Sequence, residues 1–372
     1  MAQITAAMVK ELRERTQAGM SDCKNALVEA DGDMAQAVEI LQKKGKAAAG
    51  KRAGKIAAEG LVSAVLSADG RTGVAVELNC QTDFVARGDD FKGLLKDLTA
   101  AALEHKTESA EALLAVSSGG KTFAERVEEV TARSGEKHAV RRVALLQAGE
   151  KSLLSTYVHS NGQIAVLVEV SSSQPGDPRV VEFADDVCLQ VASMSPQYLN
   201  KSDVPGDVTT KQREVFSALM DKEDAEAAAA PDDFMKRVEA IVLERAQEEG
   251  REVADPAAAA RELVATDAKF KSSHEGYVKA AEKAKARPAA QKEKILDGKV
   301  AKWLTEIVLL DQTSVKESNK TIAKLQGELA GAVADTAVVR FVRFQVGEGI
   351  EKAAGKDFAT EVAEMAAASQ KG

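Results

Sequence analysis

A stretch with β-strand pattern occurs twice in this chain, and the second copy follows the first after 92 positions, as from Gly70 to Gly162. The first copy reads LVSAVLSADGRTGVAVELN and the second reads LLSTYVHSNGQIAVLVEVS. Both glycines lie between two β-rich runs, which is the pattern of a β-hairpin. The same offset pairs Leu61 with Leu153, Ser63 with Ser155, Asp69 with Asn161, Val74 with Val166, Val76 with Val168, Glu77 with Glu169 and Phe91 with Phe183. One offset without a gap over this length indicates an ancient duplication.

A third strand is predicted to complete each copy. Residues 142–150, RVALLQAGE, resemble residues 340–348, RFVRFQVGE, with Arg, Gln, Gly and Glu at equivalent positions. Each copy is therefore expected to be a three-stranded antiparallel sheet with helices on one face, and the fold class is α+β. We assign one core subdomain to residues 53–146 and the other to residues 147–206 and 299–354.

Three short helices are predicted before the first copy, in residues 4–44. Thr5 is a candidate N-cap for the first helix and Ser21 for the second, and the turn Asp31-Gly-Asp33 precedes the third. We expect a small three-helix module in residues 1–52. Its end runs into residues 43–55, KKGKAAAGKRAGK, which carry six basic residues. We interpret this stretch as a solvated linker rather than an RNA contact, because no aromatic residue is interleaved to stack on bases.

A segment rich in Ala, Glu and Lys interrupts the second copy at residues 207–298. Apolar residues recur there at helical spacing, among them Phe234, Val238, Ile241 and Val242. The segment is punctuated by Pro231, Pro256 and Pro288. We interpret it as an inserted helical arm, in the form of an antiparallel coiled coil, and a partly disordered insertion is the alternative. Residues 355–372 are predicted to form a short amphipathic helix at the C-terminus.

The charge balance and the cysteines restrict the partners and the location. Lys and Arg number 50 against 58 Asp and Glu, a net charge of −8, whereas a nucleic-acid surface needs a basic excess. We therefore expect no direct binding of nucleic acid. No apolar run reaches the roughly 18–20 residues of a membrane span, and the N-terminus lacks the features of a signal peptide. The three cysteines, Cys23, Cys80 and Cys188, have no CxxC spacing, which favours a reducing cytoplasm.

Motifs for catalysis or cofactor binding are incomplete. The stretch Gly119-Gly-Lys-Thr122 lacks the first Gly of a phosphate-binding loop, because position 115 is Ala. The stretch GEGIEK, residues 347–352, lacks the third Gly of a dinucleotide loop. The histidines, His105, His138, His159 and His274, show no metal-ligand spacing. Cys80 ends a predicted strand, where a cysteine is usually a small buried hydrophobe. We expect no catalytic residue, no metal and no cofactor.

The turn after the first hairpin differs between the copies. At the offset of 92, Thr82-Asp83-Phe84-Val85 corresponds to Gln174-Pro-Gly-Asp177, which has ordinary turn residues. A turn needs no Phe to form, and aromatic residues are only 4% of this chain, so local folding does not explain the ring. Phe84 either folds back onto its own core or is an exposed anchor for a pocket on a partner.

The chain closely resembles the translation elongation factor Ts family, the guanine-nucleotide exchange factors of elongation factor Tu. Four segments carry the resemblance, namely ITAAMVKELRERTQAGMSDCKNAL, ELNCQTDFVAR, RRVALLQ with the hairpin after it, and FVRFQVGEGIEK. They extend from Ile4 to Lys352. The resemblance implies a ubiquitin-associated-like (UBA-like) N-terminal module, a duplicated core, a coiled-coil arm and a C-terminal helical module. It also implies a protein that acts by binding and is not an enzyme.

The resemblance implies roles for seven residues. Thr82, Asp83, Phe84 and Val85 match the segment implied to dislodge Mg²⁺ from elongation factor Tu, with Phe84 entering between helices and Asp83 orienting it. Arg13 and Met20 match N-terminal residues implied to touch a helix near the guanine-binding side. His159 matches a core histidine implied in partner contact. The partner would be bound in its GDP form and in its nucleotide-free form, and self-association is left open.

The sequence departs from the family pattern in two places, and two other functions compete with nucleotide exchange. Ser21 stands where some members carry a second Met, and the arm at residues 207–298 is longer than in the shortest members. The three-helix N-terminus alone would also suit a module that binds ubiquitin-like proteins or nascent chains. An acidic scaffold with a helical arm and no exchange activity is the other class. Neither explains the duplicated core together with the TDFV segment.

Overall fold

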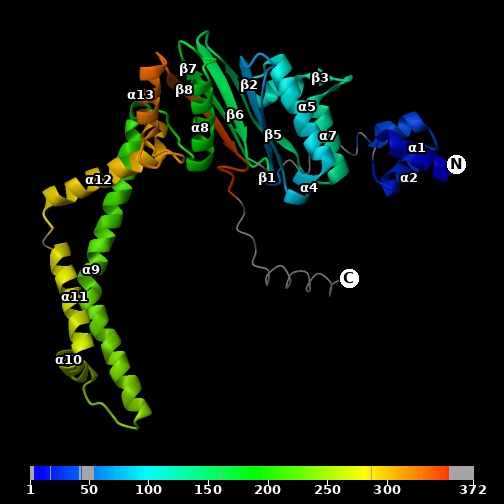
Figure 1. The fold of residues 1–372 in the computed structure, drawn as a ribbon. Coiled ribbons are helices and arrows are strands. Elements are labelled where there is room, and N and C mark those ends of the chain that lie inside the picture. Colours follow the sequence, from blue (N-terminus) through cyan, green and yellow to red (C-terminus); the bar gives the residue numbers. More distant parts are fainter. Residues whose placement is uncertain are drawn as a thin grey trace. The chain divides into compact units, whose positions relative to one another are not determined.

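The fold is that of a computed structural model (Figure 1). The residues described are 4–16, 18–41, 43, 54–159, 161–285 and 287–351. Contacts divide the chain into two compact units, Met1–Ser195 with Thr313–Gly372 and Pro196–Gln312. Most of the linker expected at residues 43–55 and the whole C-terminal helix expected at residues 355–372 lie outside the described residues. None of the helices in the described ranges is long and apolar enough to cross a bilayer.

The chain begins with helices α1 (Ala6–Thr16) and α2 (Met20–Glu29), and a further helix covers residues 34–41. They share a small core of Val9, Leu12, Cys23, Ala26, Leu27, Ala30 and Ala37. Thr5 caps α1, since its hydroxyl oxygen accepts the Met8 N–H at 3.3 Å. The expectation that Ser21 caps α2 is wrong. The extended backbone of Gly19 already starts that helix at Met20, so Ser21 lies inside the first turn.

The duplication predicted from the sequence is present as two sheets of the same design. Strands β1 (Glu59–Leu66), β2 (Thr72–Cys80) and β5 (Ala139–Gln147) form the first, in the order β1-β2-β5. Strands β6 (Ser152–Val158), β7 (Ile164–Ser171) and β8 (Ala337–Gln345) form the second, in the order β6-β7-β8. All pairings are antiparallel. Gly70 and Gly162 turn the two hairpins with φ of +67° and +69°, a conformation that favours glycine. The α+β class is therefore confirmed.

One face of each sheet packs against the other sheet, and helices cover the outer faces. Every strand contributes to the inner layer, whose buried residues are Val62, Ala64, Ala75, Leu146, Leu154, Ala165, Leu167 and Phe344. The first copy adds α4 (Asp83–Arg87), α5 (Asp89–His105), α6 (Ala110–Ala115) and α7 (Phe123–Ser134), with the short strands β3 (Ser117–Ser118) and β4 (Lys121–Thr122) before α7. The second adds α8 (Pro178–Met194) and α13 (Ile322–Ala332). The equivalent residues Phe91 in α5 and Phe183 in α8 are both buried.

Two buried glutamates connect the copies reciprocally. Glu77 in β2 accepts hydrogen bonds from Arg142 Nε at 2.5 Å and from the Gly347 N–H at 3.0 Å. Glu169 in β7 accepts them from Arg340 Nε at 2.7 Å and from the Gly149 N–H at 2.9 Å. In each case the arginine belongs to the same sheet as the glutamate, while the glycine follows the last strand of the other sheet. Each carboxylate is thus satisfied only when both copies are folded together.

The arginines of these pairs also form hydrogen bonds with the other copy. Arg142 Nη2 donates to the Gln345 carbonyl at 2.9 Å, and Arg340 Nη2 donates to the Gln147 carbonyl at 2.9 Å. Both sheets shift register directly after the glutamate. Burial alone would raise the pKa of Glu169, but the hydrogen bonds from Gly149 and Arg340 outweigh it and hold that pKa below its usual range. We name these two carboxylates and their arginine and glycine partners the reciprocal brace.

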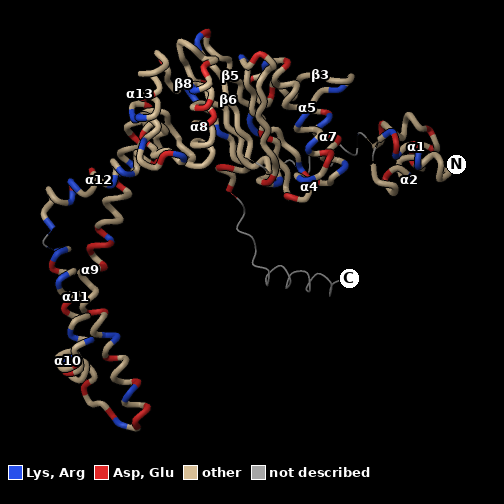
Figure 2. Tube along the Cα trace, viewed as in Figure 1, with Lys and Arg blue, Asp and Glu red and all other residues tan. Residues whose placement is uncertain are grey.

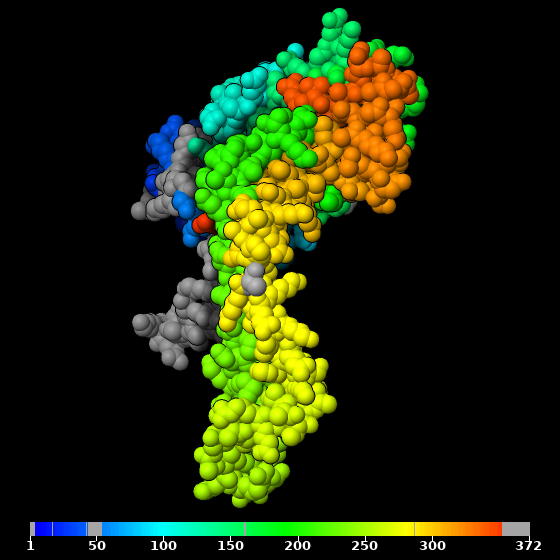
Figure 3. All heavy atoms as spheres, turned by 90° about the vertical axis from the view of Figure 1, so that its left-hand side faces the viewer, coloured from blue at the N-terminus to red at the C-terminus, as the bar shows by residue number. Residues whose placement is uncertain are grey.

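The second unit is helical. Helix α9 (Gly206–Glu248) is followed by α10 (Pro256–Thr266), α11 (Ala268–Lys285) and α12 (Ala289–Ile307), with 3₁₀ turns η1 (Lys201–Asp203) and η2 (Leu309–Asp311) at its ends. Helices α11 and α12 run antiparallel to α9, because residues farther along α9 have partners that come earlier in the chain between Tyr277 and Asp297. These pairs are Arg213–Asp297, Asp221–Lys292, Asp224–Arg287 and Phe234–Tyr277. Figures 2 and 3 show both signs of charge along this unit and α11 lying against α9.

The arm differs from the sequence-based expectation in two details. Pro231 does not punctuate it, since α9 continues through this residue, whereas Pro256 and Pro288 stand where α10 and α12 begin. The strongly helix-forming alanines 227–230 before Pro231 favour continuity. The unit also extends beyond residues 207–298, because Tyr198 and Leu309 are joined by a backbone hydrogen bond of 2.8 Å. The five module boundaries stay predictions.

We predict that Glu77→Ala lowers the free energy of unfolding by about 3 kcal/mol. This is the lower end for removing one partner of a buried ion pair, because Arg141 and Arg142 retain some access to water. Urea denaturation followed by circular dichroism measures the change. Glu150→Ala, which removes an exposed carboxylate near the brace, is the control and should stay within about 0.5 kcal/mol of wild type. Equal stability of both variants would contradict the role of the brace.

Candidate functional site

The segment Thr82–Val85 forms the start of a short helix at the end of strand β2. The sequence suggested a turn, and this interpretation is wrong, because α4 covers Asp83–Arg87 with Thr82 as its N-cap. The Thr82 hydroxyl accepts the Val85 N–H at 3.4 Å, and the Thr82 carbonyl accepts the Ala86 N–H at 3.3 Å. The acidic Asp83 in the first turn and the basic Arg87 in the last suit the helix dipole. Five residues are too few to give a periodic signal in the sequence.

Helix α4 is fixed on both sides of Phe84. On the N-terminal side of Phe84, the Glu136 carboxylate holds Thr82. It accepts the Thr82 N–H at 3.0 Å and the Thr82 hydroxyl at 2.7 Å. After the ring, Ala86 is buried in the core of the first copy. The thiol of Cys80 also donates to the Thr82 carbonyl at 3.1 Å. The backbone that carries the ring therefore has a defined position.

The Phe84 side chain is 82% exposed, the highest value among the exposed large hydrophobic residues of the described chain. The alternative that this ring folds back onto its own core is therefore wrong in this structure. Asp83 forms an ion pair with Arg87 at 2.8 Å, and both side chains are largely in water. Such a pair contributes little to stability. Val85 differs from Asp83 and Phe84, since it packs against the core of the first copy.

The tip of the second hairpin lies at the same edge of the first sheet as α4. The register places Glu59 at the start of β1 opposite Cys80 at the end of β2, directly before α4. The Val62 N–H donates to the Gly162 carbonyl at 2.8 Å, which brings the β6–β7 tip to the start of β1. His159 lies at this tip, is exposed, and has its Nδ1 3.3 Å from the Tyr157 hydroxyl. His159 therefore lies in the part of the second copy that contacts β1.

The remaining predicted residues lie on the N-terminal helices. Arg13 is exposed in the last turn of α1. Met20 begins α2 and is 54% exposed, although methionine is usually a core residue. Val28, two turns later on the same helix, is exposed as well. This helical module therefore presents apolar and cationic side chains to solvent.

No arrangement for covalent chemistry is found in the described part of the chain. Burial raises the pKa of the Cys80 thiol to about 12, so this group is not a nucleophile near neutral pH. Gly119 and Gly120 have positive φ and form the tight turn between β3 and β4, and Thr122 then caps α7. That geometry is a hairpin and not a phosphate-binding loop. The described residues contain no group of three or more His, Cys, Asp or Glu placed to hold a metal.

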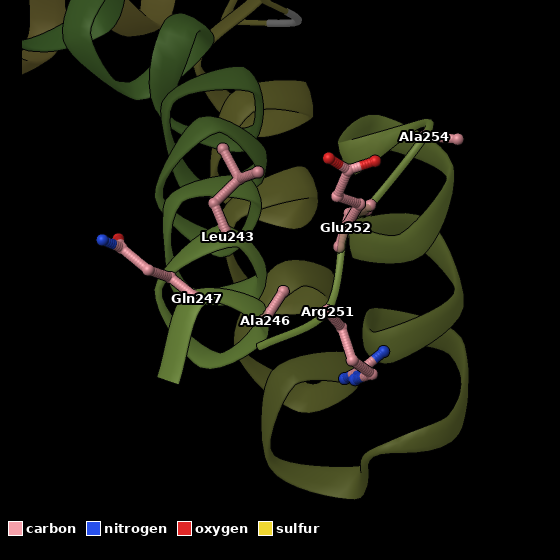
Figure 4. Close-up of a pocket in the computed structure, with 7 residues that line it drawn as sticks. Leu243, Ala246, Gln247, Arg251, Glu252 and Ala254 are labelled. Atoms are coloured by element: carbon pink, nitrogen blue, oxygen red, sulfur yellow. The ribbon is translucent and has the colours of Figure 1, made fainter. Parts of the chain in front are cut away.

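The hollow in Figure 4 belongs to the helical arm and contains no candidate residue. It is open to solvent and is lined by Leu243, Ala246, Gln247, Arg251, Glu252, Val253 and Ala254 at the end of α9. The important residue that the sequence did not reveal is Glu136. It precedes β5 and is 54 positions from Thr82, and no spacing rule connects a carboxylate to a cap at that separation. Only the fold brings the two together.

Comparisons with known proteins agree on one family. A family model described as Elongation factor TS matches residues 81–254 and 236–348. The elongation factor Ts of Clostridium perfringens is 35% identical over 364 residues, which cover 97% of this chain and 99% of that protein. The elongation factor Ts of Symbiobacterium thermophilum is 36% identical over 370 residues, covering 98% and 99%. That of Prosthecochloris aestuarii is 34% identical over 354 residues, covering 93% and 100%.

We predict that the three thiols do not react with a disulfide reagent such as DTNB in the folded protein at pH 8. All three cysteines are buried, and burial raises the pKa of Cys80 and of Cys188 to about 12. Addition of guanidinium chloride should release three reactive thiols per chain. Fast labelling of Cys80 before denaturation would contradict the inert, structural role of this residue.

Proposed function

Because the chain belongs to the elongation factor Ts family, we propose that it is the guanine-nucleotide exchange factor of an elongation factor Tu. In this proposal it binds the GDP-bound partner, promotes GDP release and forms a nucleotide-free complex that GTP then dissociates. It acts in the cytoplasm, makes and breaks no covalent bond, and needs no cofactor of its own. The observation that carries the proposal is the exposed Phe84 ring on the fixed helix α4.

The ring provides a source of binding energy that the free protein leaves unused. Burying a Phe side chain contributes about 1.5–3 kcal/mol. If all of it opposes nucleotide binding, GDP dissociation accelerates about 10- to 150-fold. We propose that Phe84 enters between helices of the partner's nucleotide-binding domain, as the family resemblance implies, while Thr82, Asp83 and Val85 place it there.

The partner's Mg²⁺ is the point at which a small displacement has a large effect. Mg²⁺ demands near-ideal octahedral geometry, and in a GTPase site it neutralises phosphate charge. A helix shift that removes one oxygen ligand therefore weakens nucleotide binding without any contact to the nucleotide. Coupling between the two binding events is reciprocal, so GTP weakens the factor's binding by the same ratio. The factor is released once GTP has entered.

A second contact supplements the wedge. Arg13 and Met20 are exposed on α1 and α2, and His159 is exposed at the edge of the first sheet near α4. We assign all three residues to partner binding. Apolar and cationic side chains such as Met and Arg are enriched in protein interfaces. Contacts that form equally well with the nucleotide-bound and the nucleotide-free partner raise the affinity of the factor for the partner. They leave the maximal rate of GDP release unchanged.

We predict that Phe84→Ala lowers the rate of GDP release from elongation factor Tu at least about tenfold, because the lost burial corresponds to at least one factor of ten. Stopped-flow release of a fluorescent GDP measures the rate. The variant should keep its thermal midpoint, since the ring is 82% exposed. Val181→Ala, which removes an exposed apolar side chain from α8, is the control. An unchanged rate for Phe84→Ala refutes the wedge.

We predict a different kinetic signature for Arg13→Ala. The factor concentration at half-maximal exchange should rise about 5- to 10-fold, the loss of roughly one ordinary hydrogen bond, with little change in the maximal rate. A titration of the factor against GDP release separates the two quantities. Arg15→Ala serves as the matched control, because Arg15 on the same helix is already paired with Glu11. A lower maximal rate at unchanged half-saturation would remove the docking assignment.

A further inference from the structure

Glu136 connects α4 by hydrogen bonds to the segment between α7 and β5. It receives both polar hydrogens of Thr82, one on each carboxylate oxygen, at 3.0 and 2.7 Å. Thr82 in turn caps the helix that carries Phe84. An isolated helix of five residues does not persist in water, so its shape depends on the cap and on its packing. Phe84 itself, being exposed, contributes nothing to that shape.

The carboxylate is held as firmly as the threonine. Helix α7 ends at Gly135, whose φ of +77° turns the chain directly into Glu136. The Glu136 N–H donates to the Ser134 hydroxyl at 3.1 Å. The buried ring of His138 places its Nδ1 2.9 Å from the Glu136 carbonyl, and it packs against Phe91 in the core with ring centroids 5.5 Å apart and the planes tilted by 44°. The backbone at Glu136 is therefore connected to the core on both sides.

We propose that Glu136 is a positioning residue for nucleotide exchange, which keeps α4 folded so that Phe84 meets the partner in a single orientation. The inference rests on the proposed exchange function. Glu136 acts through Thr82 and touches neither the partner nor its nucleotide. Without the carboxylate, the Thr82 N–H and hydroxyl lose their partners and the cap loosens. A less populated binding-competent helix lowers the apparent affinity and rate in proportion to its population.

A double-mutant cycle with Phe84 tests this role. Glu136→Ala is expected to slow GDP release from elongation factor Tu about tenfold. This is the effect if about one tenth of the molecules keep α4 in the binding-competent form. Glu136→Gln retains an acceptor for the N–H and should stay within about threefold of wild type. In the Phe84→Ala background, Glu136→Ala should cause no further loss, because both changes remove the same function. Glu104→Ala, which removes an exposed carboxylate from α5, is the control.

Backbone hydrogen exchange gives a readout that does not depend on activity. Glu136→Ala should accelerate exchange at the amides of Thr82, Val85 and Ala86 about tenfold or more, while the amides of β2 keep their wild-type protection. Unchanged exchange at these amides overturns the proposal, and so does a full additional loss of rate in the Phe84→Ala background. If the wild-type protein does not accelerate GDP release from elongation factor Tu, only the proposed function is refuted. The amide measurements still decide whether Glu136 holds α4.

Discussion

The reciprocal brace is the interaction on which the arrangement of the core depends. Each buried carboxylate accepts hydrogen bonds from its own sheet and from one backbone amide of the other copy: Glu77 binds Arg141 and Arg142, and Glu169 binds Arg340. A buried charge without its partners is strongly destabilising, so neither copy is well satisfied alone. The brace therefore makes one rigid body from two small sheets. Three-stranded sheets are small structures, and this association, with the apolar layer between them, gives each a covered inner face.

The proposed exchange site is located where the two copies differ. In the second copy, Asp177 caps α8 directly after a tight turn, with its side chain accepting the Arg179 N–H at 2.9 Å. In the first copy, α4 takes the equivalent position before α5, and Glu136 supports it from a separate segment. The shared frame carries stability in both copies. Helix α4 adds an exposed aromatic ring that stability does not require.

The sequence predicted what depends on local pattern and missed what depends on distant contacts. The offset of 92 predicted both hairpins, because alternation and turn glycines are local signals. The mismatch between the two copies drew attention to Phe84, and the family resemblance implied its role. The helical form of α4 was missed because its cap is completed by Glu136, which is 54 residues away. The continuity of α9 through Pro231 was missed because neighbouring helices and flanking alanines override a local breaker.

A preformed α4 is required by the magnitudes involved. Fixing the backbone of one residue costs about 1–2 kcal/mol, whereas burying one Phe ring returns only about 1.5–3 kcal/mol. If the five residues of α4 became ordered only on binding, the cost would exceed what the ring supplies. No energy would then remain to oppose nucleotide binding. Thr82, Ala86 and Glu136 avoid this cost by ordering the helix in the free protein. The rigidity of the segment is thus as necessary to a wedge as the exposure of its ring.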